Sequence, residues 1–403
     1  MTDVSRRQFI QLAGGGALAC MSSTTRAVVG PAPNQRVVIV MFDGFGLEYL
    51  NSTELPTLRR WRERGLYKPV KSLMPTVTNA NNTSICCGVW PDVHGISGNS
   101  YLNQQTGVED YMETSDLLRS PTLFDRAAKH GVRSALISSK KKSISLLGAG
   151  ATLKLTPEEP ESVWEERLGQ APPIYSREIN YWSLSAVQYV LQHQPEIQVI
   201  YIHTTDYPMH MWPPEAQESH EHLREVDRLL GLAEKSAPDA AFLLTADHAM
   251  NAKTRCWDLA RALDARGAPI RTAISVERDR YVKHHRGFGG ASWIYLQQPK
   301  DEAKVSRAIE RLTGVELVMT RERATKEYRL PGDRIGDLCI FGDASTVFGD
   351  LDSESEVLPP SYRSHGSSHE TGIPLFIFNA SHVPEESFFV HNLDLARWLY
   401  PSA

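Results

Sequence analysis

The feature that most limits the fold of this chain is a nearly continuous apolar, mostly β-branched run, RVVIVMF, at residues 36–42. A run without a polar face is typical of a parallel strand that is buried on both sides of a sheet. Runs of the same kind occur at 134–138, 199–203, 242–246 and 374–379. We therefore expect a largely parallel central sheet whose two faces are both covered.

Amphipathic stretches lie between these runs, for example at 55–64, 183–192 and 219–235. Apolar residues at helical spacing predict helices that pack one face against a sheet. Strand alternating with helix indicates an α/β fold with a doubly wound, mostly parallel sheet.

The alternation breaks between 252 and 347, where GFGG at 287–290 precedes a strand-like run and a helix-like stretch. We expect an inserted smaller α+β lobe there. The predicted signal and linker occupy residues 1–30. The catalytic α/β core is predicted to consist of two segments, 31–251 and 348–403, and the inserted lobe is predicted at 252–347.

The composition is that of an ordinary globular chain of 403 residues, with 41% hydrophobic and 23% charged residues. A formal net charge of -5 argues against binding to a nucleic-acid polymer, which requires a clustered positive surface. An anionic small-molecule substrate would need local positive charge instead. Oligomeric state is left open, with a homodimer as one alternative.

The first residues resemble a twin-arginine export signal, because SRRQFI at 5–10 is followed by a short apolar, glycine-rich run at 12–19. That run is too short to span a bilayer as a helix, so no stable membrane span is expected. Cys20 loosely resembles a lipoprotein cleavage site, and 25–27 offers an alternative cut. We expect a periplasmic or exported protein, with lipid anchoring at Cys20 as a weaker alternative.

Polar side chains follow the predicted strands where ligands of α/β sheets bind, beyond the carboxyl ends. Each has an ordinary explanation, because Asp commonly caps helices and single histidines commonly pack or face solvent. Together they form the set of nitrogen and oxygen donors that a hydrolytic zinc site uses, and manganese or iron would also fit. These residues are Asp43, Asp206, His210, Asp247, His248, His365 and His369.

A polar, Pro-initiated segment at 75–84 is predicted to be a turn that runs into an apolar helix beginning near Ile85. A helix N-terminus presents unpaired N–H groups to an anion. A hydroxyl there, such as that of Thr78, can attack phosphorus when a metal lowers its pKa. From these residues alone, a helix-capping role remains the alternative.

Four segments together resemble the alkaline phosphatase superfamily, specifically its nucleotide pyrophosphatase/phosphodiesterase branch, and within it the phosphonoacetate hydrolases most. They are PTVTNANNTSICCGVWPDVHGISGN at 75–99, IHTTDYPMH at 202–210, TADHAMNAK at 245–253 and RSHGSSHE at 363–370. The resemblance covers most of the chain after the signal. It implies an alkaline phosphatase-like fold and a zinc-dependent hydrolase.

The resemblance also assigns roles to residues. It implies two zinc ions per chain, with Thr78 as the nucleophile and Asn99 as a hydrogen-bond donor to a phosphoryl oxygen. His365 matches the His-Gly of the family and is the expected ligand, which leaves His369 as a second-shell candidate. The implied ligands are Asp206, His210 and His365 for one ion, and Asp43, Thr78, Asp247 and His248 for the other.

Three consecutive lysines follow the predicted strand at 134–138. Such a triplet usually faces solvent. By resemblance, however, Lys140 and Lys142 match the Lys-x-Lys pair that holds the substrate carboxylate. We therefore expect hydrolysis of phosphonoacetate to acetate and phosphate.

Two alternatives to this activity stay open. One is an exported type I phosphodiesterase or nucleotide pyrophosphatase, for which Trp90, Tyr101 and Tyr207 could form a slot for a base. The other is a non-catalytic binding protein on the same scaffold. The complete set of ligands and Thr78 disfavours the second.

Overall fold

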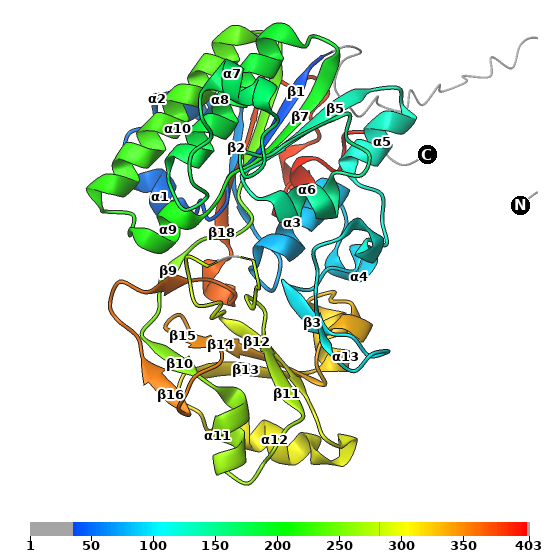
Figure 1. Ribbon diagram of the computed structural model, residues 1–403, viewed down its shortest axis with the longest axis vertical. Coiled ribbons are helices and arrows are strands. Elements are labelled where there is room, and N and C mark those ends of the chain that lie inside the picture. The colour runs from blue at the N-terminus through cyan, green and yellow to red at the C-terminus, as the bar shows by residue number, and fades with distance from the viewer. Residues whose placement is uncertain (1–34, 282, 401–403) are drawn as a thin grey trace, which may run out of the picture.

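The computed structural model describes residues 35–281 and 283–400 of the chain. Two bodies are stacked along its long axis, and the upper one in Figure 1 contains the large central sheet. This sheet has seven strands in the order β2-β18-β8-β1-β7-β5-β6. Its strands are β1 (Val37–Met41), β2 (Leu66–Lys71), β5 (Arg133–Ser138), β6 (Leu153–Leu155), β7 (Ile197–His203), β8 (Ala241–Thr245) and β18 (Gly372–Phe378).

Strands β8, β1, β7, β5 and β6 are parallel to one another, whereas β18 is antiparallel to both β8 and β2. The predicted mostly parallel sheet is therefore confirmed. Every residue of β1 and β8 is buried, which explains their unbroken apolar sequences. Burying one Val, Leu or Ile side chain contributes about 1.5–3 kcal/mol, so these strands stabilise the centre of the core.

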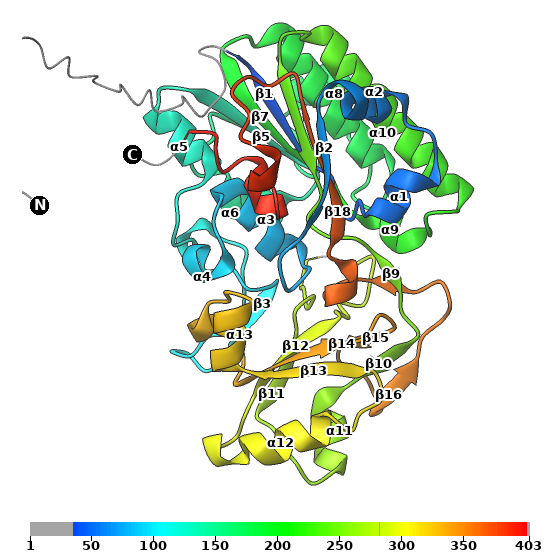
Figure 2. The same cartoon turned by 180° about the vertical axis from the view of Figure 1, so that it is seen from behind.

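Helices cover both faces of the sheet, as a doubly wound fold requires. Helices α2, α8 and α10 lie on one side, and α3, α5 and α6 lie on the other (Figures 1 and 2). The helices of this body are α1 (Leu47–Ser52), α2 (Pro56–Arg64), α3 (Thr78–Cys87), α4 (Pro91–His94), α5 (Leu123–Lys129), α6 (Lys141–Leu147), α7 (Ser162–Leu168), α8 (Glu178–His193), α9 (Tyr207–Met211) and α10 (Gln217–Ser236).

The second body is built mainly from the segment between β8 and β18. It contains a four-stranded sheet, β11-β12-β14-β13, and a three-stranded sheet, β15-β10-β16. Its elements are β9 (Asn251–Ala252), β10 (Arg255–Trp257), α11 (Leu259–Ala265), β11 (Thr272–Ser275), β12 (Ala291–Tyr295), α12 (Glu302–Ile309), β13 (Val315–Thr320), α13 (Arg321–Glu327), β14 (Leu338–Gly342), β15 (Thr346–Phe348), β16 (Ser355–Val357) and β17 (Arg363–Ser364). The lobe boundaries at 252 and 347 stay a prediction. Beyond residue 347, β16 pairs with β10 and β17 pairs with β9.

The segment that leads into α3 packs against the second body. Met74 and Val77 belong to the same buried cluster as Trp293 of β12 and Phe341 of β14. A short hairpin of β3 (Ser100–Leu102) and β4 (Glu109–Tyr111) follows on the same side. The start of α3 is therefore fixed from both bodies at once.

The predicted export signal and Cys20 lie outside the described residues. Among the described helices, none combines the length and the apolar character that crossing a membrane requires.

Candidate active site

Helix α3 begins at Thr78, so the prediction of a turn up to a helix near Ile85 is wrong. Its first two turns are rich in Asn, Thr and Ser, which are weak helix formers because they hydrogen-bond the backbone in other conformations. Here the tertiary structure satisfies these groups. The Asn81 amide donates to the carbonyls of Leu73 and Pro75 at 3.0 and 2.9 Å, which ties the preceding loop to the helix.

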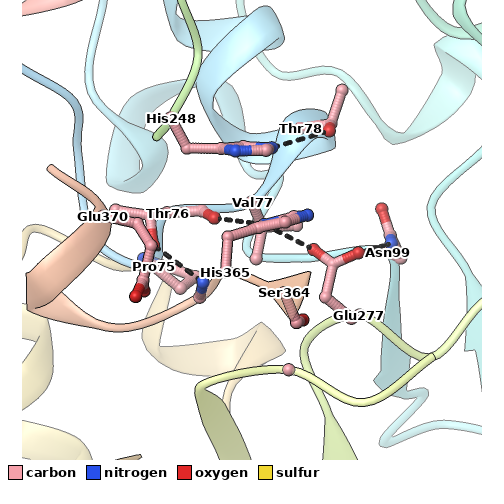
Figure 3. Close-up of polar contacts among 12 residues, drawn as sticks. Pro75, Thr76, Val77, Thr78, Asn99, His248, Glu277, Ser364, His365 and Glu370 are labelled. Atoms are coloured by element: carbon pink, nitrogen blue, oxygen red, sulfur yellow. Dashed lines mark hydrogen bonds and ion pairs between the residues drawn. The ribbon is translucent and has the colours of Figure 1, made fainter. Parts of the chain in front are cut away.

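The Thr78 side chain lies at the N-terminal end of α3, and this end of the helix faces the carboxyl ends of the central strands. Its Oγ1 lies 3.3 Å from Nε2 of His248, which follows β8 (Figure 3). The same atom lies 3.4 Å from Oδ1 of Asp43, two residues after the end of β1. Thr78 is only 6% exposed. The predicted nucleophile thus lies among the predicted metal ligands.

Asp43, Asp247 and His248 form one buried group that could hold a metal ion, with one ligand atom of each within 4.8 Å of the others. Nε2 of His248 lies 3.2 Å from Oδ2 of Asp247, which has no hydrogen-bond partner among the described residues. Nδ1 of His248 lies 2.9 Å from the carbonyl oxygen of Ala249. A proton on Nδ1 would donate to that oxygen and leave Nε2 as a lone-pair donor toward the carboxylates.

Asp206 and His365 form another metal-capable group with His248, and His210, the third ligand predicted for this ion, also faces Asp206. Nδ1 of His210 donates to the carbonyl of Arg363 at 2.8 Å, and Nδ1 of His365 donates to that of Thr76 at 2.7 Å (Figure 3). Both rings therefore turn Nε2 toward Oδ2 of Asp206, at 2.9 and 3.6 Å. Neither Nε2 atom makes a hydrogen bond to the described residues. Backbone-oriented imidazoles with free Nε2 atoms are the arrangement of histidines that share a cation.

Negative charge at this site exceeds the positive charge that the side chains supply. Burial and the Asp206 charge raise the pKa of Asp43, but Lys140 and His203 outweigh them and hold it below its ordinary value. Burial is also the largest single effect on Asp206 and raises its pKa, but Lys140, His210 and His365 together outweigh burial and hold the pKa well below its ordinary value. Burial and the charge of Asp43 raise the pKa of Asp247 well above its ordinary value. The donor set and this surplus of carboxylates fit divalent cations.

The two predicted substrate-binding lysines are both buried at the start of α6, with 4% and 6% exposure for Lys140 and Lys142. Nζ of Lys140 lies 2.8 Å from Oδ2 of Asp43 and 3.0 Å from Oδ1 of Asp206. Lys142 pairs with Asp279 of the second body. The structure thus brings both lysines to the catalytic edge, and their role toward a substrate stays a prediction.

Asn99 lies beside Glu277 of the second body (Figure 3). Its Nδ2 donates to Oε2 of Glu277 at 3.4 Å, and its Oδ1 is buried without a hydrogen-bond partner among the described residues. His369, which was predicted to lie behind the metal ligands and support them, lies elsewhere. Its Nε2 is 2.6 Å from Oε2 of Glu316 on β13, so the structure does not bring it to the cluster.

Several residues at this site were not predicted. His203 lies 3.2 Å from Oδ2 of Asp43, and the loop at 276–290 of the second body supplies Glu277, Asp279 and His284. The adjacent histidines beside GFGG were the signal available in the sequence. These histidines do not directly follow a strand of the central sheet, so the sequence did not predict that they would lie at this site.

Comparison with known proteins shows the protein family to which this chain belongs. Residues 37–369 match the family model described as type I phosphodiesterase / nucleotide pyrophosphatase. The chain belongs to this family, within the alkaline phosphatase superfamily.

Two solved structures resemble this chain at different levels of sequence identity. A phosphonoacetate hydrolase from Sinorhizobium meliloti 1021, solved with phosphonoformate, is 28% identical with a TM-score of 0.81, over 90% of this chain and 95% of that one. Murine ENPP5 shares the fold at 16% identity and a TM-score of 0.65, over 85% of this chain and 88% of that one.

A mouse bis(5'-adenosyl)-triphosphatase, enpp4, is 27% identical over 57% of this chain and 50% of that protein. The chain spans about half or less of the length of the curated relatives it matches.

Proposed function

We propose that this chain hydrolyses phosphonoacetate to acetate and phosphate, with Thr78 as the nucleophile. The observation that carries the proposal is the burial of Lys140 and Lys142 on the catalytic edge, where solvated lysines would be expected to point outward. The similar hydrolase from Sinorhizobium meliloti, whose structure is known with phosphonoacetate, supports the same substrate.

Two zinc ions are part of this proposal. One would be held by Asp206, His210 and His365, and the other by Asp43, Thr78, Asp247 and His248. When bound, these ions would supply Lewis-acid chemistry, which favours the alkoxide of Thr78 and neutralises charge on the phosphoryl oxygens.

The protein's own groups then perform the following steps. Thr78 gives its hydroxyl proton to water, and its Oγ1 forms a bond to phosphorus as the carbon–phosphorus bond breaks. Asn99 donates a hydrogen bond to a phosphoryl oxygen. The electron pair left on carbon moves into the carboxylate, and the carbon takes a proton from water to give acetate. Water then cleaves the phosphothreonine and releases phosphate.

The lysines stabilise the charge that develops on the carboxylate during bond cleavage, where a preorganised ammonium has its largest effect. Lys142 pairs with Asp279 and Lys140 with Asp43 and Asp206. A substrate carboxylate would therefore compete with Asp279 for Lys142. With the proposed cations beside Asp43 and Asp206, Lys140 would be released toward the substrate.

The second candidate function is a type I phosphodiesterase or nucleotide pyrophosphatase, which the family model favours. Of the aromatic residues considered for a base-binding slot, Tyr207 follows Asp206 directly, and its ring centroid lies 5.5 Å from that of His284. Trp90 instead packs against His391 and Arg329, and Tyr101 is buried beside Arg334.

Replacing Lys142 with Ala separates the two functions. We expect kcat/KM for phosphonoacetate to fall roughly 10- to 150-fold, the range for losing a charged hydrogen bond, because the carboxylate loses its ammonium partner. Hydrolysis of bis-p-nitrophenyl phosphate, which has no carboxylate, should change little. The measurement is phosphate release beside nitrophenolate release from the metal-loaded protein.

Lys141→Ala is the matched control, because the Lys141 side chain is about half-exposed and pairs with Glu159. It should leave both activities close to those of the unaltered protein. Equal losses on both substrates in Lys142→Ala would contradict a carboxylate-binding role. Faster turnover of the diester than of phosphonoacetate by the unaltered protein would assign the chain to the phosphodiesterases.

Export through a twin-arginine signal is also part of the proposal, supported by SRRQFI at 5–10. Changing Arg6 and Arg7 to Lys should retain the protein in the cytoplasm, measured by fractionation and immunoblotting of the full chain. An unchanged distribution between the compartments would contradict export by this route.

A further inference from the structure

The loop between β11 and β12, described at 276–281 and 283–290, connects the second body to the catalytic edge. Besides the contact of Glu277 with Asn99, Asp279 pairs with Lys142, and the Tyr281 hydroxyl donates to Glu158. These contacts place the loop across the metal-capable groups.

His284 is a buried loop residue that lies beside Asp206 and whose ring nitrogens make no hydrogen bond to the described residues. Its side chain is 3% exposed, and its Nε2 lies 4.0 Å from Oδ1 of Asp206. Neither ring nitrogen makes a hydrogen bond within the described residues. Leaving a buried polar group unpaired costs about 1–3 kcal/mol. A buried imidazole with two unpaired nitrogens beside a carboxylate therefore indicates a missing ligand.

The neighbouring histidines form a further metal-capable group. One ligand atom each of His210, His284 and His285 lies within 4.8 Å of the others. The ring of His285 stacks on that of His210 at a centroid distance of 4.4 Å, and its Nδ1 accepts a hydrogen bond from the backbone N–H of Gly287. His285 thus packs against His210, and His284 is left as the ring with both nitrogens unpaired.

We propose that His284 is an additional protein ligand of the metal ion held by Asp206, His210 and His365. A catalytic zinc typically has three protein ligands and one open position, and it can expand to five ligands. His284 would fill that position from the second body until a substrate oxygen displaces it or joins it. The inference rests on the proposed two-metal centre.

Neighbouring aromatic rings restrict the His284 side chain. Tyr207 and Tyr175 pack around it, with ring centroids 5.5 and 5.4 Å away, and restrict its movement. The ring is thus held near the position from which it would coordinate.

Cobalt binding to the full-length protein tests the inference, because Co²⁺ replaces zinc and reports its ligands in the visible spectrum. The unaltered protein should bind two Co²⁺ ions. In His284→Ala we expect one of the two dissociation constants to rise about 10-fold or more, with a changed visible absorption band. Equilibrium dialysis gives the constants, and circular dichroism checks folding. If His284→Ala does not fold, His284→Gln should show the same loss, because an amide of similar size is a poor ligand.

His193→Ala is the matched control, because His193 is exposed at the end of α8. It should keep both constants and the spectrum. No bound Co²⁺ in the unaltered protein would contradict the two-metal centre itself. Two tightly bound ions whose constants and spectrum stay unchanged in His284→Ala would overturn only the role of His284. A third ion that His284→Ala loses would overturn it too, since His284 would then belong to a separate site.

Discussion

Replacing Thr78 with Ala should lower kcat by about 10⁴-fold or more, on phosphonoacetate and on bis-p-nitrophenyl phosphate alike. The reason is that the variant lacks the oxygen that forms the covalent bond to phosphorus. The structure supports this role, because Oγ1 of Thr78 lies 3.3 Å from His248 and 3.4 Å from Asp43. The measurement is product release at saturating substrate, with metal content determined on the same preparation.

Thr83→Val is a matched control on the same helix. Thr83 is fully buried in α3, and its hydroxyl has no hydrogen-bond partner among the described residues. It should therefore tolerate an isostere with little change in kcat. Thr78→Ser, which keeps a hydroxyl, should recover part of the activity. Turnover by metal-replete Thr78→Ala within 10-fold of the unaltered protein would rule out Thr78 as the nucleophile.

The central sheet could be predicted because its strands are buried on both faces. In β1 and β8 no residue contacts solvent, so the sequence cannot alternate between polar and apolar residues. The metal-capable side chains were predicted to come together for a related reason. Parallel strands end at one edge of a sheet, so residues such as Asp43 and Asp247 must meet there.

Helix α3 could not be predicted from local preferences. Asn81 and Asn82 disfavour a helix in an isolated peptide, because their side chains compete for backbone hydrogen bonds. In the folded chain Asn81 holds the preceding loop, and Asn82 accepts a hydrogen bond from the Tyr201 hydroxyl at 2.6 Å. The partners are far along the chain, so the stabilisation is visible only after folding.

The choice between His365 and His369 depends on a close approach between the two bodies. Gly366 has φ +120°, and a Cβ there would lie 2.6 Å from the backbone nitrogen of Gly290. The N–H of Gly290 also donates to the carbonyl of His365 at 2.7 Å. This approach fixes His365 over the site and directs His369 to Glu316. It depends on the second body, whose position no local pattern in the sequence indicates.

Removing bound metal with a chelator should abolish activity and lower the melting temperature of the full-length protein. The buried carboxylates of Asp43, Asp206 and Asp247 lie close together, and Lys140 is the ammonium that contacts two of them. An ion present at 1,000 times its dissociation constant stabilises the folded state by about 4 kcal/mol. Thermal unfolding followed by circular dichroism, with and without EDTA, measures the shift. Returning zinc should restore both activity and melting temperature.

The variant Lys140→Met tests whether Lys140 and the metal ions both compensate the charge of these carboxylates. Without the ammonium, the chelated protein retains the carboxylates with less compensation, so EDTA should lower its melting temperature further than that of the unaltered protein. Lys141→Met, on the exposed side of α6, should show the ordinary shift. An EDTA-treated protein that keeps its activity and melting temperature would contradict a metal centre. An equal shift in Lys140→Met and Lys141→Met would instead show that Lys140 does not share the charge of these carboxylates with the metal ions.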